Sequence, residues 1–121
     1  MPSILIVDDD ELVRIFLRRL LEKKGFEVTE ACNGMEGFNL YQASCPDLVL
    51  IDIVMPVKDG ITTLKEIKRL NKKQKIIAIS GGSVFTPGTY LDEAEKAGAD
   101  CVIPKPFCQK SLVRTINMLL G

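Results

Sequence analysis

The chain has 121 residues, 46% hydrophobic and 26% charged, a balance typical of one folded globular domain rather than a disordered segment. Sixteen basic and sixteen acidic residues give a formal net charge of zero, whereas a general nucleic-acid-binding protein carries a basic excess. No apolar run approaches the roughly 20 residues of a membrane span, and the N-terminus lacks the basic and long apolar regions of a signal peptide. We therefore expect one cytoplasmic domain over residues 1–121, without direct nucleic-acid contact or membrane contact.

The chain contains no histidine, which excludes histidine-based acid–base catalysis and mixed Cys/His zinc sites. The four cysteines are not in C-x-x-C spacing, so neither a redox dithiol nor a zinc knuckle is predicted. They are Cys32, Cys45, Cys101 and Cys108. We expect isolated reduced thiols in or near the core, with Cys108 the one to probe for oxidation because it lies beside the chemistry described below.

Five short strand-like runs alternate with five segments of helical periodicity; four of the runs are mainly apolar, and 26–30 alternates apolar and polar residues. The runs lie at 3–7, 26–30, 47–52, 76–80 and 101–103, and the helical patterns at 11–24, 35–44, 64–70, 91–97 and 112–120. Mostly continuous apolar strands that alternate with helices are typical of a parallel sheet covered on both faces. Because crossovers between parallel strands are right-handed, the pattern predicts an open, doubly wound α/β sandwich.

Local signals delimit two of these helices. Asp10 is placed to cap the first helix, and Gly25 is expected to end it. Thr63 and Glu66 have the spacing of a capping box at the start of the third helix. The apolar stripe expected to face the core on the first helix consists of Leu12, Val13, Phe16, Leu17, Leu20 and Leu21.

Polar side chains stand at the carboxyl ends of four of the predicted strands. The first strand is followed by Asp8 and Asp9, and the third ends in Asp52. The fourth ends in Ser80, and Lys105 follows the fifth. Ligands of such sheets bind at this edge. Crowded carboxylates repel one another unless a cation lies among them, and Mg²⁺ prefers such hard oxygen ligands. The sequence therefore predicts a magnesium site here.

Each of these residues also has a simpler structural interpretation when it is taken alone. Asp8 or Asp9 could interact with a helix dipole, and Asp52 could begin a loop. Ser80 could be a turn hydroxyl, and Lys105 a solvated side chain. Four segments that bring these residue types to one edge favour the functional interpretation.

Several segments of the sequence resemble those of a known protein family. They are 4–10 (ILIVDDD), 47–56 (DLVLIDIVMP) followed by Asp59-Gly60, then Ile79-Ser80, 98–100 (GAD) and 105–107 (KPF). On these stretches, and over its whole length, the chain resembles the response-regulator receiver domains of two-component signalling. The resemblance implies a flavodoxin-like five-stranded parallel sheet, (βα)5, with strand order 2-1-3-4-5.

The resemblance also implies roles for the carboxylates. Asp52 would accept a phosphoryl group. Mg²⁺ would be bound by Asp9, by Asp52 and by the backbone carbonyl of Val54, and Asp8 would act through a metal-bound water. Lys105 would pair with the acceptor carboxylate and then with the phosphoryl oxygens.

Three further positions concern the switch that phosphorylation would operate. Ser80 would hydrogen-bond the phosphoryl group, and Gly81 would leave room beside it. Val102 stands where the family often has Tyr or Phe, so this chain lacks the aromatic form of the switch residue.

The implied donor is the phosphohistidine of a sensor histidine kinase or histidine phosphotransfer protein. Phosphorylation would switch a protein-interaction surface on the fourth helix, fifth strand and fifth helix. The chain would be a phosphoacceptor that assists its own phosphorylation and dephosphorylation, not an enzyme for external substrates.

Alternatives stay open at this point. A degenerate receiver would bind a protein independently of phosphorylation. We expect residues 1–121 to form the receiver domain without an output domain. The receiver could act alone or within a longer regulator, and as a monomer or a phosphorylation-dependent homodimer. The lysine-rich segment 65–75 is a solvated helix end or a docking site for an acidic partner.

Two other classes of protein fit less well. A flavin-binding carrier needs a Ser/Thr/Gly phosphate loop after the first strand, where this chain has three aspartates. A phosphatase with an aspartyl-phosphate intermediate generally has a second Asp two residues after the nucleophile, where this chain has Val54.

Overall fold

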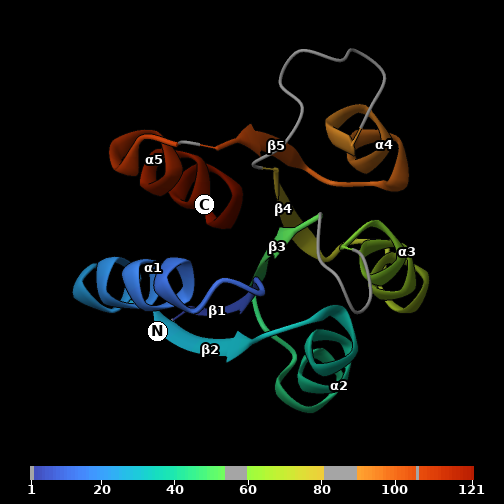
Figure 1. Cartoon of the computed structure of the whole chain (residues 1–121), viewed down its shortest axis with the longest axis horizontal. Coiled ribbons are helices and arrows are strands. Elements are labelled where there is room, and N and C mark those ends of the chain that lie inside the picture. The colour runs from blue at the N-terminus through green and yellow to red at the C-terminus, as the bar shows by residue number, and fades with distance from the viewer. Residues whose placement is uncertain (1, 54–59, 81–89, 106) are drawn as a thin grey trace.

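The structure is a computed structural model that describes residues 2–53, 60–80, 90–105 and 107–121, apart from the side chains of residues 80 and 90–92. The elements alternate along the chain (Figure 1). They are β1 (Ser3–Val7), α1 (Glu11–Lys23), β2 (Glu27–Ala31), α2 (Gly34–Ser44), β3 (Leu48–Asp52), α3 (Gly60–Leu70), β4 (Lys75–Ser80), α4 (Tyr90–Ala97), β5 (Cys101–Pro104) and α5 (Gln109–Leu120).

The five strands form one parallel sheet in the order β2-β1-β3-β4-β5. Figure 1 shows α1 and α5 on one face of this sheet and α2, α3 and α4 on the other. This arrangement confirms the doubly wound α/β prediction and the strand order that the resemblance implied. Among the described helices, none has the length and apolarity needed to cross a membrane.

The core has two halves because successive side chains of a strand point to opposite faces of the sheet. On β1, Leu5 and Val7 pack on the face covered by α2, α3 and α4, while Ile4 and Ile6 pack beneath α1 and α5. All of β3 is buried, in agreement with its position at the centre of the sheet. The carboxyl end of β3 is therefore fixed from both sides.

Both ends of α1 agree with the sequence prediction. The Asp10 side chain accepts hydrogen bonds from the backbone N–H of Leu12 (2.9 Å) and of Val13 (3.5 Å). Gly25 has φ of +94°, a conformation that favours glycine, directly after the helix ends. The chain therefore enters and leaves α1 at fixed points, and the first of these adjoins Asp8 and Asp9.

The predicted inward stripe of α1 is wrong at two positions. Leu17 and Leu21 are buried, but 77% of Leu12 and 42% of Phe16 are exposed. The stripe inferred from spacing is wider than the surface of the sheet that one helix can cover. Phe16 instead lies beside Phe107, with 6.4 Å between the ring centroids.

Two other local expectations are also wrong. Since α3 begins at Gly60, Thr63 and Glu66 lie within the helix and are not a capping box at its start. Cys32, Cys45 and Cys108 are exposed rather than in or near the core, whereas Cys101 is half-buried against the core, as expected. All four cysteines are free thiols, as expected.

Gly60 lies against the end of β3 more closely than any other residue type allows. A Cβ added there would be 2.2 Å from the carbonyl oxygen of Asp52 and 2.5 Å from the Cα of Ile53. The Gly60 N–H donates to the carbonyl oxygen of Ile53 at 3.2 Å. The start of α3 therefore packs directly on the backbone that presents Asp52.

We predict that Gly60→Ala lowers the free energy of unfolding by about 3 kcal/mol, because the added methyl group meets backbone that cannot move aside. Urea denaturation followed by circular dichroism measures this change. Gly25→Ala is the control: its Cβ would meet nothing within 4 Å, so only the positive φ is unfavourable, at about 1 kcal/mol. Equal losses in the two variants would contradict the close approach at Gly60.

Candidate functional site

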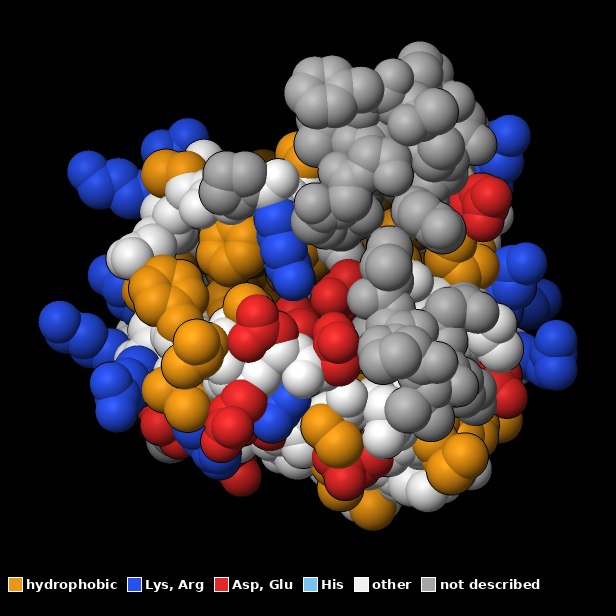
Figure 2. Space-filling model, in the orientation of Figure 1, with side chains coloured by type: hydrophobic (Ala, Val, Ile, Leu, Met, Phe, Trp, Pro, Cys, Tyr) orange, Lys and Arg blue, Asp and Glu red, His pale blue; other side chains and the backbone are white. Residues whose placement is uncertain are grey.

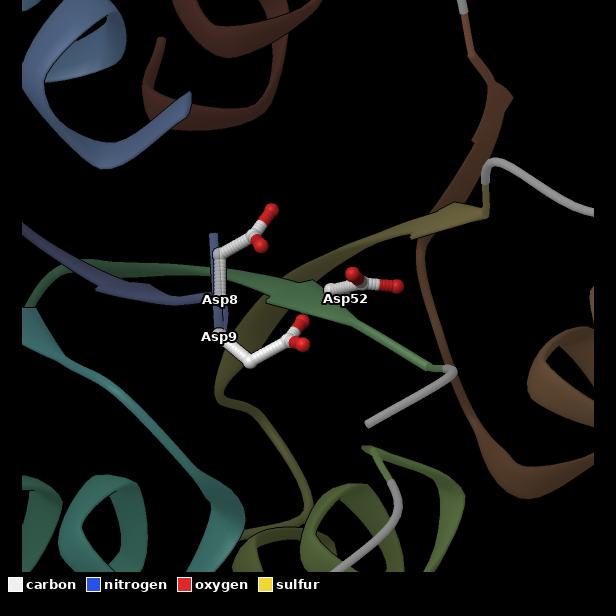
Figure 3. Close-up of side chains that lie close together, drawn as sticks. All are labelled: Asp8, Asp9 and Asp52. Carbon is white, nitrogen blue, oxygen red and sulfur yellow. The ribbon is translucent and has the colours of Figure 1, made fainter. Parts of the chain in front are cut away.

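The candidate site lies at the carboxyl ends of β1, β3 and β5. Asp8 directly follows β1, Asp52 is the last residue of β3, and Lys105 directly follows β5. The register pairs Val7 with Ile51, so Asp8 and Asp52 are the next residues on neighbouring strands. Figure 3 shows Asp8, Asp9 and Asp52 gathered at this edge, with the Asp9 carboxylate directed toward Asp52.

Asp8 is buried, and its surroundings fix both its backbone and its carboxylate. Its N–H donates to the carbonyl oxygen of Ala31 on β2 at 3.1 Å. Oδ1 accepts from the N–H of Asp10 at 2.9 Å, and Oδ2 accepts from Lys105 Nζ at 3.2 Å. Both carboxylate oxygens of Asp8 thus have protein donors.

Lys105 places an ammonium group between two buried carboxylates. Its Nζ lies 3.2 Å from Asp8 Oδ2 and 3.4 Å from Asp52 Oδ2. Burial lowers the pKa of Lys105, but the negative charges of Asp8 and Asp52 outweigh burial and raise this pKa above its ordinary value. The ion pairs therefore keep Lys105 protonated at neutral pH.

The three aspartates have the donor atoms of a site for a divalent cation. One carboxylate oxygen from each of Asp8, Asp9 and Asp52 can be chosen so that all lie within 4.8 Å of one another. Asp9 is exposed, and no hydrogen bond or ion pair joins its carboxylate to the part of the chain that the structure describes. Three carboxylates against one ammonium leave an excess of negative charge, so a hard cation such as Mg²⁺ fits this donor set.

Figure 2 looks onto this edge of the molecule. Acidic side chains gather at the centre of the view, bordered by a basic side chain, and hydrophobic side chains lie to their left over α1 and α5. Within the cluster, Asp9 is exposed, whereas Asp8 and Asp52 are buried beside it.

The remaining predicted site residues are placed only in part. Ser80 ends β4 opposite Pro104, so its backbone reaches the same edge of the sheet. The Ser80 side chain, Gly81 and the Val54 carbonyl lie outside the described residues. Val102 is half-buried against the core on the face covered by α2, α3 and α4.

Cys108 lies at the start of α5, three residues after Lys105, and it is fully exposed. The nearby backbone N–H groups of Ser111 and then of Lys110 lower the pKa of its thiol below the ordinary value. Its side chain belongs to the helix start and not to the acidic cluster, which has oxygen donors alone.

Arg14 is a further residue of the site, and it lies outside the apolar stripe that the sequence predicts for α1. Its Nη1 donates to the carbonyl oxygen of Asp8 at 2.7 Å, and its Nε lies 3.2 Å from Glu30 Oε1 on β2. The signal available in the sequence was its position one helical turn after the cap Asp10, which brings it back toward the end of β1.

The fold and these side chains define a doubly wound α/β domain with a carboxylate and lysine site at the carboxyl edge of its sheet. A family model described as "Response regulator receiver domain" matches residues 4–117. The chain therefore belongs to the receiver domains of two-component response regulators.

Curated relatives agree with this assignment. The chain is 42% identical over 119 residues to chemotaxis protein CheY of Bacillus subtilis (strain 168), covering 98% of the chain and 97% of that protein. It is 41% identical over 119 residues to chemotaxis protein CheY of Halobacterium salinarum, covering 98% and 96%. Transcriptional regulatory protein CpxR of Escherichia coli (strain K12) is 38% identical over 120 residues, which span 99% of the chain and 50% of CpxR.

Solved structures show the same fold. A CheY-like response regulator receiver domain protein from Methanospirillum hungatei JF-1 has a TM-score of 0.90 at 30% identity, covering 99% of this chain and 94% of that one. Chemotaxis protein CheY4 of Vibrio cholerae has a TM-score of 0.88 at 26% identity, covering 98% of each chain.

We predict that Asp9→Asn stabilises the metal-free protein by about 1 kcal/mol, because it removes one of three mutually repelling carboxylates. Urea denaturation in EDTA measures this gain. Glu11→Gln is the control, since Glu11 is an exposed carboxylate in the first turn of α1, outside the cluster. Its loss should leave stability unchanged or slightly lower. A destabilised Asp9→Asn would show that no repulsion is relieved.

We predict that Lys105→Met destabilises the protein by about 2 kcal/mol at neutral pH, because it leaves the carboxylates of Asp8 and Asp52 buried without their cation. The folded-state pKa of Lys105 is raised, so its contribution is complete below the unfolded pKa and disappears as pH rises through the folded pKa. The difference from wild type should therefore shrink only in strongly alkaline solution. Lys110→Met, at an exposed lysine of α5, is the control. Equal stability of the two variants would contradict the role of Lys105.

Proposed function

We propose that the protein accepts a phosphoryl group on Asp52 from the phosphohistidine of a sensor histidine kinase or a histidine phosphotransfer protein. The observation that carries this proposal is the position of the Asp52 carboxylate. This carboxylate is buried at the end of the central strand, accepts a hydrogen bond from Lys105 Nζ and lies near the carboxylate of Asp9. The family assignment supports the same chemistry.

In the proposed transfer, an Asp52 carboxylate oxygen attacks the phosphorus atom of the donor. A phosphorus–oxygen bond forms while the phosphorus–nitrogen bond to the donor imidazole breaks, and the imidazole keeps that electron pair. Such transfers depend on positioning and on compensation of charge more than on covalent chemistry by the protein. Lys105 fits this need, because its ammonium group already contacts Asp52 and can follow the added negative charge onto the phosphoryl oxygens.

Mg²⁺ would be held by Asp9 and Asp52, together with the carbonyl of Val54. Asp8 would act through a metal-bound water, since both of its carboxylate oxygens already accept hydrogen bonds from Asp10 and Lys105. When bound, the ion compensates the negative charge of carboxylates and phosphoryl group in the same place.

After transfer, Ser80 would hydrogen-bond the phosphoryl group, with Gly81 leaving room beside it. The loop after β4 would change conformation and bias the surface of α4, β5 and α5 toward a downstream partner. This change would take place without the aromatic side chain that is frequent in the family at the position of Val102. The proposed setting is the cytoplasm, and the domain would also assist its own dephosphorylation.

The test is incubation with acetyl phosphate and Mg²⁺, followed by intact mass measurement. Wild type should gain one phosphoryl group, and Asp52→Asn or EDTA should abolish the gain. Asp47→Asn, an exposed change that retains an oxygen acceptor for the Ser3 N–H, should remain phosphorylatable.

A gain that persists in Asp52→Asn would place the acceptor elsewhere. No gain by folded wild type, from acetyl phosphate and then from a phosphohistidine donor, would contradict the proposal. It would favour the alternative of a protein-binding module that works without phosphorylation.

A further inference from the structure

The peptide unit between Asp8 and Asp9 is held by a side chain from α1. Arg14 Nη1 donates to the Asp8 carbonyl oxygen at 2.7 Å. A peptide unit is planar, so this carbonyl oxygen and the nitrogen of Asp9 belong to one rigid group. The Arg14 hydrogen bond therefore restricts the orientation of the backbone from which the Asp9 side chain projects.

Arg14 is itself oriented by β2. Its Nε lies 3.2 Å from Glu30 Oε1, and only 15% and 21% of the two side chains are exposed. The residue after Glu30 is Ala31, whose carbonyl oxygen accepts from the N–H of Asp8 at 3.1 Å. The end of β2 thus holds Asp8 in two ways, directly through the backbone and indirectly through Arg14.

Asp9 depends on this backbone restraint more than Asp8 does. The Asp8 carboxylate has two donors of its own, Asp10 and Lys105. The Asp9 carboxylate is exposed and has no hydrogen-bond or ion-pair partner within the described ranges. Its place in the acidic cluster therefore follows from the direction of its Cα–Cβ bond and the rotamer that it adopts.

We propose that Arg14, oriented by Glu30, is a positioning residue for the divalent-cation site. It fixes the Asp8–Asp9 peptide so that the Asp9 carboxylate stays within reach of Asp52. Replacement of a residue that orients a metal ligand without touching the metal commonly lowers metal affinity by about 10–100-fold. This inference rests on the proposed function, in which Asp9 is a Mg²⁺ ligand.

Arg18 offers a matched control one helical turn further along α1. It also pairs with Glu30, but its other hydrogen bonds go to the carbonyl oxygen of Val28 (2.9 Å) and to Glu22 (3.3 Å). Arg14→Met and Arg18→Met each remove one positive charge and one ion pair with Glu30. Only Arg14→Met also releases the Asp8 carbonyl.

The direction of the expected effect separates positioning from simple charge. Loss of a positive charge near three carboxylates would by itself strengthen the binding of a cation. We expect Arg14→Met to weaken Mg²⁺ binding about tenfold, and Arg18→Met to leave it within about twofold or slightly stronger. Electrostatics alone cannot weaken the affinity in either variant.

The experiment is calorimetric titration of each metal-free protein with MgCl₂, with thermal denaturation in EDTA to confirm that each variant is folded. Arg14→Lys should bind Mg²⁺ more tightly than Arg14→Met and less tightly than wild type. The lysine ammonium group can donate to the Asp8 carbonyl, but it cannot bind Glu30 at the same time as the planar guanidinium group does. Arg14→Ala, which also removes the positive charge and the hydrogen bond to the Asp8 carbonyl, should weaken binding about tenfold and serves if Arg14→Met does not fold.

A second readout needs no metal. The ¹⁵N–¹H resonance of the Asp9 amide should shift in Arg14→Met and stay in place in Arg18→Met, because only the first change alters the peptide that contains it. Equal Mg²⁺ affinity in Arg14→Met and wild type, or equal weakening in Arg14→Met and Arg18→Met, would overturn the inference. Wild type that binds no Mg²⁺ would contradict the proposed function instead, and the Asp9 amide would still test the restraint.

Discussion

The functional edge of this domain depends on one ammonium group placed among carboxylates. Lys105 follows the edge strand β5, yet its Nζ reaches Asp52 on the central strand and Asp8 after β1. Without it, two buried carboxylates would face each other with no cation between them. With it, an excess of negative charge still remains because of Asp9, so the site is partly compensated and can take a further cation.

Two adjacent aspartates follow β1, and the structure gives them different properties. Asp8 is 2% exposed and fixed through its N–H, its carbonyl and both carboxylate oxygens. Asp9 is exposed, and its carboxylate is available to a ligand. The hydrogen bonds of Asp8 restrain the backbone of both residues. The Asp9 backbone is therefore held in place while both oxygens of its carboxylate stay available to a metal ion. This division explains why neighbouring residues of identical chemistry are expected to serve one site in different ways.

Much of the fold and part of the site were predictable from the sequence. Continuous apolar strands alternating with helices require a parallel sheet, and a parallel sheet brings Asp8, Asp52 and Lys105 to one edge whatever the loops do. The contribution of Arg14 was not predicted, because helical spacing puts it outside the apolar stripe of α1 and its position one turn after Asp10 does not by itself show a contact. The exposure of Leu12 and the start of α3 at Gly60 were missed for a related reason. Both depend on how closely a helix approaches the sheet, which is a tertiary property that residue spacing does not contain.

In the proposed function, Asp52 receives a phosphoryl group beside a metal ion held by Asp9. A crystal structure of the protein with Mg²⁺ and beryllofluoride, an analogue of a phosphoryl group, would show this arrangement. We expect beryllium bonded to an Asp52 carboxylate oxygen, the metal ion on Asp9 and Asp52, and Lys105 Nζ in contact with a fluorine. Beryllium on another carboxylate, or a metal ion that does not contact Asp9, would contradict the proposed function.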